Sequence, residues 1–302
     1  ALFVGYPVHS GLLDSHDIKV GAFIAESERL PPMWVQCADR CDIIAVPSDW
    51  LRGVFIEHGI SADKVLTVPH GIDPWYFKTP PKRAPKMDSH LRFLHISGAR
   101  DFPHRKGTPQ LIAAFKKLFG AKGPYKDLGA QLVIRTPDAE WLHKAIEGSE
   151  HLFELDLASE ALPALQMRHV YCNHITALVQ PSAAEAFGIC PLEARALRIP
   201  VICTHCTGHT QHASSTDTII VHQPSVDMKV NGIPKGKAPK IKVADVMRGL
   251  IAFMNRLRKV ATEGPDRADI YCQPEGYWGE DYKKWTWPAV TKPLAERILE
   301  LL

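Results

Sequence analysis

Two glutamates, Glu185 and Glu193, stand eight positions apart around the glycine-containing segment 187–189. The apolar run before them, 176–180, is too short for a helix and predicts a buried strand. Pro191 and Glu193 are typical of the first turn of a following helix. The backbone N–H groups of 187–189 would then lie at a helix N-terminus, where anions bind, and Gly188 would let the backbone approach such a ligand closely.

The roles of the two glutamates stay open on spacing alone. An acidic side chain beside a phosphate site can accept hydrogen bonds from ribose hydroxyls, as in dinucleotide-binding folds. Equally, Glu193 would complement the helix dipole and Glu185 would be solvated. A second apolar run, 199–203, follows the predicted helix. The order strand, helix, strand predicts one βαβ unit of a parallel sheet.

The segment 181–201 reads P-S-A-A-E-A-F-G-I-C-P-L-E-A-R-A-L-R-I-P-V. It resembles the Glu-x7-Glu signature of retaining GT-B glycosyltransferases of family 4. The resemblance implies the GT-B fold, in which two Rossmann-like, doubly wound α/β domains face a cleft. It also implies a metal-independent transfer of a hexose from a nucleotide-sugar donor, such as a UDP- or GDP-sugar, to an acceptor hydroxyl. No cofactor is expected beyond that substrate.

The same resemblance implies roles for individual residues. Glu193 would hold the ribose, and Glu185 would contact the hydroxyls of the donor sugar. The N–H groups of Phe187, Gly188 and Ile189 would stabilise the charge of the leaving nucleoside diphosphate. Members of the family retain the anomeric configuration by a front-face displacement that uses no dedicated carboxylate base.

The family pattern has glycine where this chain has Arg198, at the end of the signature helix. A left-handed backbone at that position would cost a non-glycine residue about 1 kcal/mol or more. We therefore expect this helix to end without an ordinary left-handed cap at Arg198.

Arg100 and Lys106 lie in a glycine-containing loop after a predicted strand at 91–96. Arginine can bind two phosphate oxygens and lysine supplies a compact charge, but charge alone favours a solvated basic loop. The R-x5-K-G spacing resembles the diphosphate-binding pair of the same family. It implies that both residues bind and activate the donor.

Residues 1–73 alternate predicted strands and helices, and three of their motifs resemble the end of the first domain in this family. These motifs are E-x3-L-P-x2-W at 26–34, V-P-S at 46–48 and V-P-H-G-I-D at 68–73. They arrive early in the chain, and we find no glycine-rich loop near its start. We therefore expect a shortened first domain, either because the domain is naturally reduced or because the chain begins within it.

Candidates on the first-domain side of the cleft are His9, Ser10, His16 and Glu26. The family places a histidine near the transferred sugar, but His9 and His16 could as easily be surface residues, because residue type alone is weak evidence. Glu26 follows a predicted strand, so we expect it at the cleft. Among these, His9 and Glu26 are the expected catalytic residues.

The sequence predicts four parts. They are a shortened acceptor-side domain at 1–78, a Pro- and Lys-rich linker at 79–90, a nucleotide-sugar-binding domain at 91–275, and a C-terminal helix at 276–302 that crosses back to the first domain. Within the third part, Thr136 would line the base pocket, and the segment Thr207, Gly208 and His209 would close over the donor sugar.

Two other clusters have alternative interpretations. Cys203 and Cys206 lie near three histidines, but a structural zinc site needs a second pair of ligands, so no metal is expected. The lysine-rich stretch 229–242 predicts a solvated loop, although a membrane-surface contact stays open.

Composition limits the class of protein. A net charge of +3 on 302 residues is too small to argue for nucleic-acid binding, and seven cysteines without framework spacing indicate reduced thiols in a cytoplasmic protein. Carbohydrate, lipid and protein acceptors stay open, as does a homo-oligomer. Two rival functions also remain: a catalytically silent nucleotide-sugar-binding subunit and a nucleotide-sugar epimerase of GT-B fold.

Overall fold

The computed structural model describes the residues that form the two sheets and their helices. They are residues 1–7, 15–76, 90–97, 103–137, 140–157, 162–172, 175–214, 217–230, 233–263 and 283–301. His9, Ser10 and Arg100 lie outside this set, as does the linker up to residue 89.

The N-terminal domain is built on a four-stranded parallel sheet in the order β1-β2-β3-β4. The strands are β1 Leu2–Gly5, β2 Val20–Phe23, β3 Ile43–Val46 and β4 Val65–Thr67, and the helices are α1 Pro32–Asp39 and α2 Asp49–Glu57. Ser48 caps α2, since its hydroxyl accepts the Leu51 N–H at 3.2 Å. The apolar faces of the helices bury Phe23 and Phe55, whose rings stack in the core.

The C-terminal domain is built on a six-stranded parallel sheet in the order β10-β9-β8-β5-β6-β7. The strands are β5 Arg92–Ile96, β6 Gln131–Thr136, β7 Phe153–Leu157, β8 Ala177–Gln180, β9 Val201–Thr204 and β10 Thr218–Ile220. Chain order therefore reverses between β5 and β8. In open α/β sheets, ligands bind at the carboxyl ends of the strands beside such a switch point.

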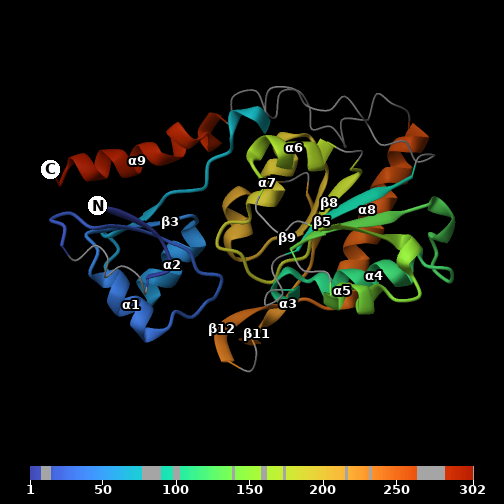
Figure 1. The fold of residues 1–302 in the computed structure, drawn as a ribbon, viewed down its shortest axis with the longest axis horizontal. Coiled ribbons are helices and arrows are strands. Elements are labelled where there is room, and N and C mark those ends of the chain that lie inside the picture. The colour runs from blue at the N-terminus through green and yellow to red at the C-terminus, as the bar shows by residue number, and fades with distance from the viewer. Residues whose placement is uncertain are drawn as a thin grey trace.

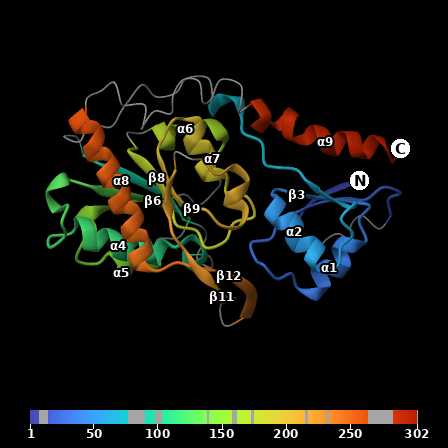
Figure 2. The ribbon, with the colours of Figure 1, turned by 180° about the vertical axis from the view of Figure 1, so that it is seen from behind.

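Helices cover both faces of this sheet (Figures 1 and 2). The helices are α3 Pro103–Lys106, α4 Thr108–Phe119, α5 Glu140–Ile146, α6 Ala164–Cys172, α7 Ile189–Ala196 and α8 Val243–Glu263. On one face α4, α5 and α8 bury a cluster that includes Phe93, Phe115 and Phe253. On the other face α6 and α7 bury Tyr171 and Leu192.

Direct hydrogen bonds join the two domains. The Ser48 hydroxyl donates to the Ala186 carbonyl oxygen at 2.7 Å, and the Asp49 N–H donates to the Gln211 side-chain oxygen at 2.8 Å. The same serine therefore caps α2 and holds a loop of the C-terminal domain. Ala186 is itself a member of the N-terminal core cluster.

The last helix, α9 Trp287–Leu299, lies above the N-terminal domain in the view of Figure 1. Its start is fixed by the Ile72 N–H, which donates to the Trp285 carbonyl oxygen at 2.7 Å. A Cβ on Gly71 would lie 2.5 Å from the Trp287 ring, so glycine lets the indole pack against the backbone.

The lysine-rich stretch is a β-hairpin, so the prediction of a loop there was wrong. Strands β11 Gln223–Val230 and β12 Ile233–Lys240 pair antiparallel between β10 and α8. A two-stranded ribbon has only edge strands, which tolerate the prolines of β12. The hairpin reaches the N-terminal domain, where the Ser225 hydroxyl donates to the Glu28 carboxylate at 2.6 Å.

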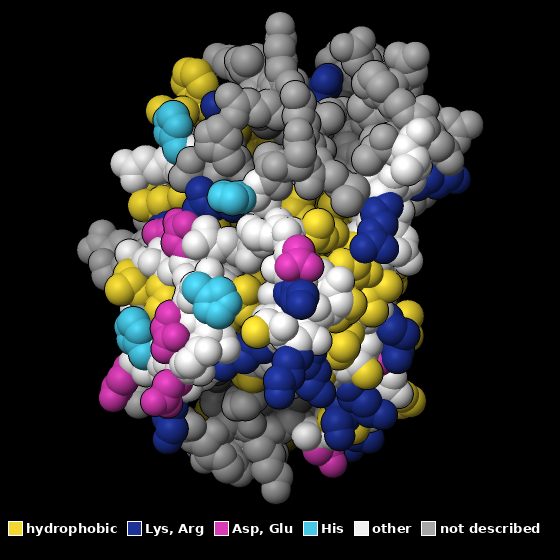
Figure 3. All heavy atoms as spheres, turned by 90° about the vertical axis from the view of Figure 1, so that its right-hand side faces the viewer, with side chains coloured by type: hydrophobic (Ala, Val, Ile, Leu, Met, Phe, Trp, Pro, Cys, Tyr) yellow, Lys and Arg dark blue, Asp and Glu magenta, His cyan; other side chains and the backbone are white. Residues whose placement is uncertain are grey.

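Charged side chains of both signs lie on the face of the C-terminal domain that is turned away from the N-terminal domain (Figure 3). Within the described ranges, no helix combines the length and the apolar composition that a bilayer crossing requires. The 21-residue α8 is long enough, but it is amphipathic and carries charged residues along its outer side.

The expectation for Arg198 was also wrong. Arg198 has φ +58°, its N–H donates to the Arg195 carbonyl, and the Ile199 N–H donates to the Ala194 carbonyl. These two bonds form a Schellman motif with a left-handed residue directly after the C-cap Leu197. The cost of the left-handed arginine is outweighed because the motif satisfies the last carbonyls and sends the chain into β9.

We expect Arg198→Gly to raise the free energy of unfolding by about 0.5–1 kcal/mol. Glycine has no Cβ and so relieves the strain of the left-handed backbone. The greater entropy of the unfolded glycine chain offsets part of this gain. Urea denaturation measures the change. Arg198→Ala is the matched control, since it removes the same charge and keeps a Cβ. Equal stabilities of the two variants would contradict the prediction.

Candidate functional site

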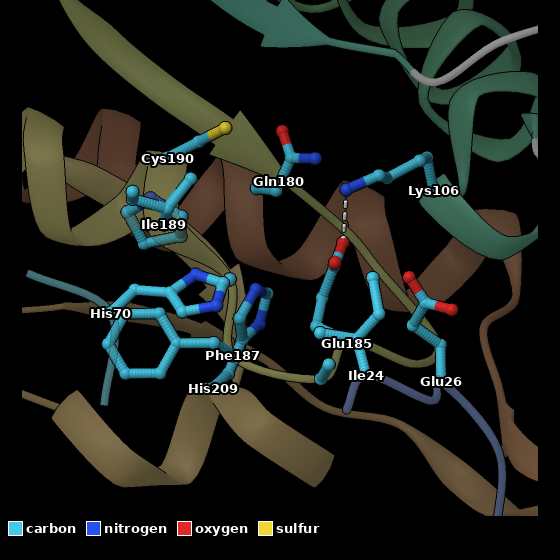
Figure 4. Close-up of a pocket in the computed structure, with 13 residues that line it drawn as sticks. Ile24, Glu26, His70, Lys106, Gln180, Glu185, Phe187, Ile189, Cys190 and His209 are labelled. Carbon is cyan, nitrogen blue, oxygen red and sulfur yellow. Dashed lines mark hydrogen bonds and ion pairs between the residues drawn. The ribbon is translucent and has the colours of Figure 1, made fainter. Parts of the chain in front are cut away.

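A cavity of about 140 Å³ lies between the two domains at the carboxyl ends of their strands. Ile24, Glu26 and His70 line it from the N-terminal side, after β2 and β4 (Figure 4). From the C-terminal domain it is lined by Lys106, Gln180, the segment 185–191 and His209. The cavity therefore occupies the position that the doubly wound topology favours for a ligand.

Glu185 is bound by two cations on one side of this cavity. The Lys106 Nζ lies 2.5 Å from one carboxylate oxygen, and an Arg105 guanidinium nitrogen lies 3.0 Å from the other. Arg105 also lies 3.6 Å from the Glu26 carboxylate. Two cations and two carboxylates from both domains thus form one network, and Figure 4 shows its Lys106–Glu185 pair.

The charge state of Glu185 is fixed by this network. Burial alone raises the pKa of the carboxyl, but the charges of Lys106 and Arg105 outweigh burial and hold its pKa well below its ordinary value. Burial likewise opposes the charge of Arg105, whereas Glu185 and Glu26 raise the pKa of its guanidinium. The buried carboxylate is therefore ionised at neutral pH.

The backbone of Glu185 is held by the loop after β9. The Glu185 N–H donates to the Thr207 hydroxyl at 3.0 Å, and the Gly208 N–H donates to the Glu185 carbonyl oxygen at 2.8 Å. A Cβ on Gly208 would lie 2.3 Å from the backbone of Ala186, so only glycine fits there. Gly208, expected to close over a donor, thus positions the glutamate.

Helix α7 begins at the cavity wall, as the anion site requires. Its N-cap Gly188 has φ +82°, and Ile189 is the first helical residue. The first N–H groups of a helix have no intrahelical partner, so they face the cavity as potential donors. The Phe187 ring packs between His70 and His212, with centroid separations of 5.1 and 4.7 Å.

Glu193 lies one turn deeper than the sequence predicted. Because α7 starts at Ile189, Glu193 is its fifth residue and no acidic residue lies in the first turn. Its carboxylate accepts the Tyr171 hydroxyl at 2.8 Å and is not among the groups that line the cavity. Burial raises the pKa of Glu193 to about 7, so the acid is partly protonated near neutral pH.

A second buried ion pair holds α7 and His212 in place behind the cavity. Arg195 on α7 donates to both carboxylate oxygens of Asp217, at 2.8 and 2.6 Å. It also donates to His212 at Nδ1 and at the carbonyl oxygen. Burial raises the pKa of Asp217, but the hydrogen bond with His205 and the charge and hydrogen bonds of Arg195 outweigh burial and lower the pKa to about 2.

The donor atoms of Cys203, His205 and Asp217 lie within 4.8 Å of one another. A metal ion there would compete with Arg195, which already engages both Asp217 oxygens. Burial also raises the pKa of the Cys203 thiol and disfavours the thiolate that a metal requires. These residues therefore form an ion-pair network rather than a ligand set.

The structure brings together only part of the predicted site. Glu185, Lys106, Glu26 and the segment 187–189 meet at the cavity, whereas His16 is exposed in a turn. Thr136 is buried at the end of β6 and does not line the cavity. His9 and Arg100 lie outside the described residues.

Sequence reasoning missed Arg105 and His70, and it gave His209 only as part of the segment 207–209 that was expected to close over the donor sugar. Arg105 is adjacent to Lys106 in the basic loop, and only its place in α3 turns it toward Glu185. His70 was part of the V-P-H-G-I-D motif, which marked a chain position but assigned no role to the histidine.

Residues 97–236 match the family model of Glycosyl transferases group 1. No curated protein shows a significant sequence match to the chain. The matched segment contains Lys106, Glu185, Glu193 and His209.

Several solved structures share the fold. HepE of Anabaena, in complex with UDP and glucose, is 14% identical with a TM-score of 0.65, and the match covers 93% of this chain and 72% of that one. Sucrose-phosphate synthase of Thermosynechococcus elongatus is 14% identical with a TM-score of 0.65, covering 99% and 73%. TarM of S. aureus, in complex with UDP, Fondaparinux and alpha-GlcNAc-glycerol, is 13% identical with a TM-score of 0.63, covering 98% and 54%. These similarities show the fold, the GT-B architecture of two Rossmann-like domains that the sequence predicted.

We expect Glu193→Gln to change how stability depends on pH. The pKa of Glu193 is raised to about 7 from 4.5, so its wild-type contribution is fully present below pH 4.5 and is lost as pH rises to about 7. The glutamine keeps an acceptor for Tyr171 and does not ionise. The variant should therefore match wild type at pH 4.5 and exceed it by up to about 3 kcal/mol at pH 8.

Urea denaturation at pH 4.5, 6 and 8 measures this difference. Glu147→Gln, at an exposed position after α5, is the control. If the difference between wild type and Glu193→Gln is the same at all three pH values, the burial argument for Glu193 is wrong.

Proposed function

We propose that this chain is a retaining glycosyltransferase of family 4 type, which moves a sugar from a nucleoside diphosphate sugar to an acceptor hydroxyl without a metal. One observation carries the proposal: Lys106 and the start of α7 face one cavity, beside a glutamate that Arg105 and Lys106 keep ionised. The donors found in similar structures include UDP-glucose, the ligand of HepE from Anabaena.

The diphosphate of the donor would lie between Lys106 and the N–H groups of 187–189. A nucleoside diphosphate leaves more readily when fixed positive charge and N–H groups stabilise its developing negative charge. Lys106 can turn from Glu185 to the phosphates because Arg105 still neutralises the carboxylate from its other oxygen. Arg100 is proposed as a further phosphate ligand on the strength of the R-x5-K-G spacing alone.

Glu185 would accept hydrogen bonds from the hydroxyls of the donor sugar. Its low pKa makes it a weak base, and its oxygens are already bonded to cations. Such a group orients hydroxyls better than it removes protons. This agrees with a front-face displacement in which the leaving phosphate, rather than a carboxylate, takes the proton of the acceptor.

The remaining assignments follow from position. Glu193 would reach the ribose once a donor reorganises its contact with Tyr171, and Thr136 would lie near the base at the end of β6. Glu26 and His9 would face the acceptor from the N-terminal domain. We also propose that residues 1–78 form the acceptor side, and that 91–275 hold the donor.

We expect the chain to bind one nucleoside diphosphate among UDP, GDP and ADP, and Lys106→Met to weaken that binding by about 10- to 100-fold. The estimate corresponds to the loss of one charged hydrogen bond, about 1.5–3 kcal/mol. Isothermal titration calorimetry measures it. Lys117→Met, at an exposed position on α4, is the control.

If none of the three nucleotides binds, the proposed function is wrong. Binding of a nucleotide sugar without hydrolysis or transfer would indicate a silent binding subunit instead. Conversion of the donor sugar to an epimer in the absence of an acceptor would indicate an epimerase.

We expect slow hydrolysis of a UDP-α-sugar, with water as acceptor, to release the α-anomer first and to continue in excess EDTA. Both follow from a leaving group stabilised by lysine and N–H groups on the face that the acceptor attacks. Proton NMR resolves the anomers before mutarotation mixes them. Initial release of the β-anomer would contradict retention, and a loss of turnover in EDTA would contradict metal independence.

A further inference from the structure

Two buried histidines, His209 and His212, lie on one short 3₁₀ helix, Thr207–His212, and differ in how many of their ring nitrogens are hydrogen-bonded. His212 has a partner at each ring nitrogen: its Nδ1 accepts from Arg195 at 2.8 Å and its Nε2 donates to the Phe187 carbonyl oxygen at 2.9 Å. His209 has a partner at Nδ1 only. Its Nε2 is buried and has no hydrogen-bond partner among the described residues.

The tautomer of His209 follows from its one partner. Nδ1 lies 2.9 Å from the Thr204 carbonyl oxygen, and a carbonyl can only accept, so Nδ1 carries the proton. The Thr204 hydroxyl, 3.5 Å away, uses its own proton on the Ser182 carbonyl oxygen. In the neutral ring, Nε2 therefore carries a lone pair and can only accept a hydrogen bond.

The ring is neutral at physiological pH. Burial lowers the pKa of His209 to about 4, with further lowering by Lys106 and Arg195, and with Glu185 and the Thr204 hydrogen bond acting in the opposite direction. The ring is 1% exposed. A buried acceptor without a partner is unfavourable, so the lone pair of Nε2 needs an explanation in terms of a ligand or a structural role.

His209 lines the cavity beside Glu185 and the start of α7 (Figure 4). A Cβ on Gly188 would lie 2.4 Å from Nε2, so the missing side chain of Gly188 is what leaves room at this atom. The diphosphate offers only acceptor oxygens, which a lone pair repels. A hydroxyl, by contrast, can donate, and Glu185 at the same wall selects for hydroxyls as well.

We infer that His209 Nε2 accepts a hydrogen bond from one hydroxyl of the donor sugar and thereby determines which sugar the cavity accepts. The inference rests on the proposed function, because it needs a nucleotide sugar with its sugar at Glu185. Glu185 and His209 together present acceptors from two directions. The site therefore favours a sugar with hydroxyls directed at both, over a sugar that lacks one of them.

The test compares binding of UDP-glucose with binding of its 2-, 3-, 4- and 6-deoxyfluoro analogues, because fluorine fills the place of a hydroxyl but cannot donate. If calorimetry shows that the chain binds GDP or ADP instead of UDP, GDP-glucose or ADP-glucose and its deoxyfluoro analogues replace the UDP-glucose series. We expect wild type to bind the analogue that lacks the recognised hydroxyl about 10-fold or more weakly, in line with the loss of a buried hydrogen bond.

His209→Leu fills a similar volume without an acceptor, so it should bind that one analogue and the parent sugar about equally. The other three analogues should keep their wild-type ratios, and UDP alone should bind as it does to wild type. His209→Gln, with an amide oxygen at a similar reach, should restore part of the discrimination. His151→Leu, exposed at the opposite end of the sheet before β7, is the control.

Thermal melting checks that each variant folds, and His209→Gln keeps the test informative if the leucine variant does not. If UDP binds normally but His209→Leu keeps every wild-type ratio, the inference about His209 is overturned and the proposed function stands. If neither UDP, GDP nor ADP binds to wild type, the proposed function itself fails.

Discussion

The rest of the site depends on one buried carboxylate, Glu185, that two cations keep ionised. Removing a single partner from such a buried pair leaves an uncompensated charge, which is far more costly than the pair is stabilising. The fold therefore has to bring α3 to this carboxylate, and Gly107 makes this possible. With φ +71°, and with the position of its absent Cβ only 2.2 Å from the Pro181 carbonyl oxygen, Gly107 lets the α3–α4 junction lie directly on the loop that carries Glu185.

Much of the fold could be predicted because the signals are local. Apolar runs of four to six residues marked the strands at 92–96, 131–136 and 177–180, and Ser48 marked the start of α2. In the βαβ unit around Glu185, a proline in the first turn of the helix and a glycine before it mark where the helix begins. The alternation of strands and helices also predicted a doubly wound sheet with ligands at the carboxyl ends of its strands, and the cavity lies at those ends.

The unpredicted features depend on tertiary contacts. The hairpin at 223–240 has no alternation strong enough to distinguish it from a loop, and one of its anchors, Glu28, is almost two hundred residues away in the chain. Arg198 adopts a left-handed conformation because a hydrogen-bonded helix end outweighs its local preference. For His209, the protonated nitrogen is set by the Thr204 carbonyl, a contact that residue type does not reveal.

Ala186 sits in the hydrophobic core of the opposite domain, and Ser48 holds its carbonyl oxygen there. Glu185 is the neighbouring residue in the chain, so its carboxylate lies at the interface between the two domains. Separation of the two domains would remove Ala186 from the N-terminal core and would displace the backbone of Glu185. The packing of one domain against the other and the geometry of the charged network at Glu185 therefore depend on the same short segment.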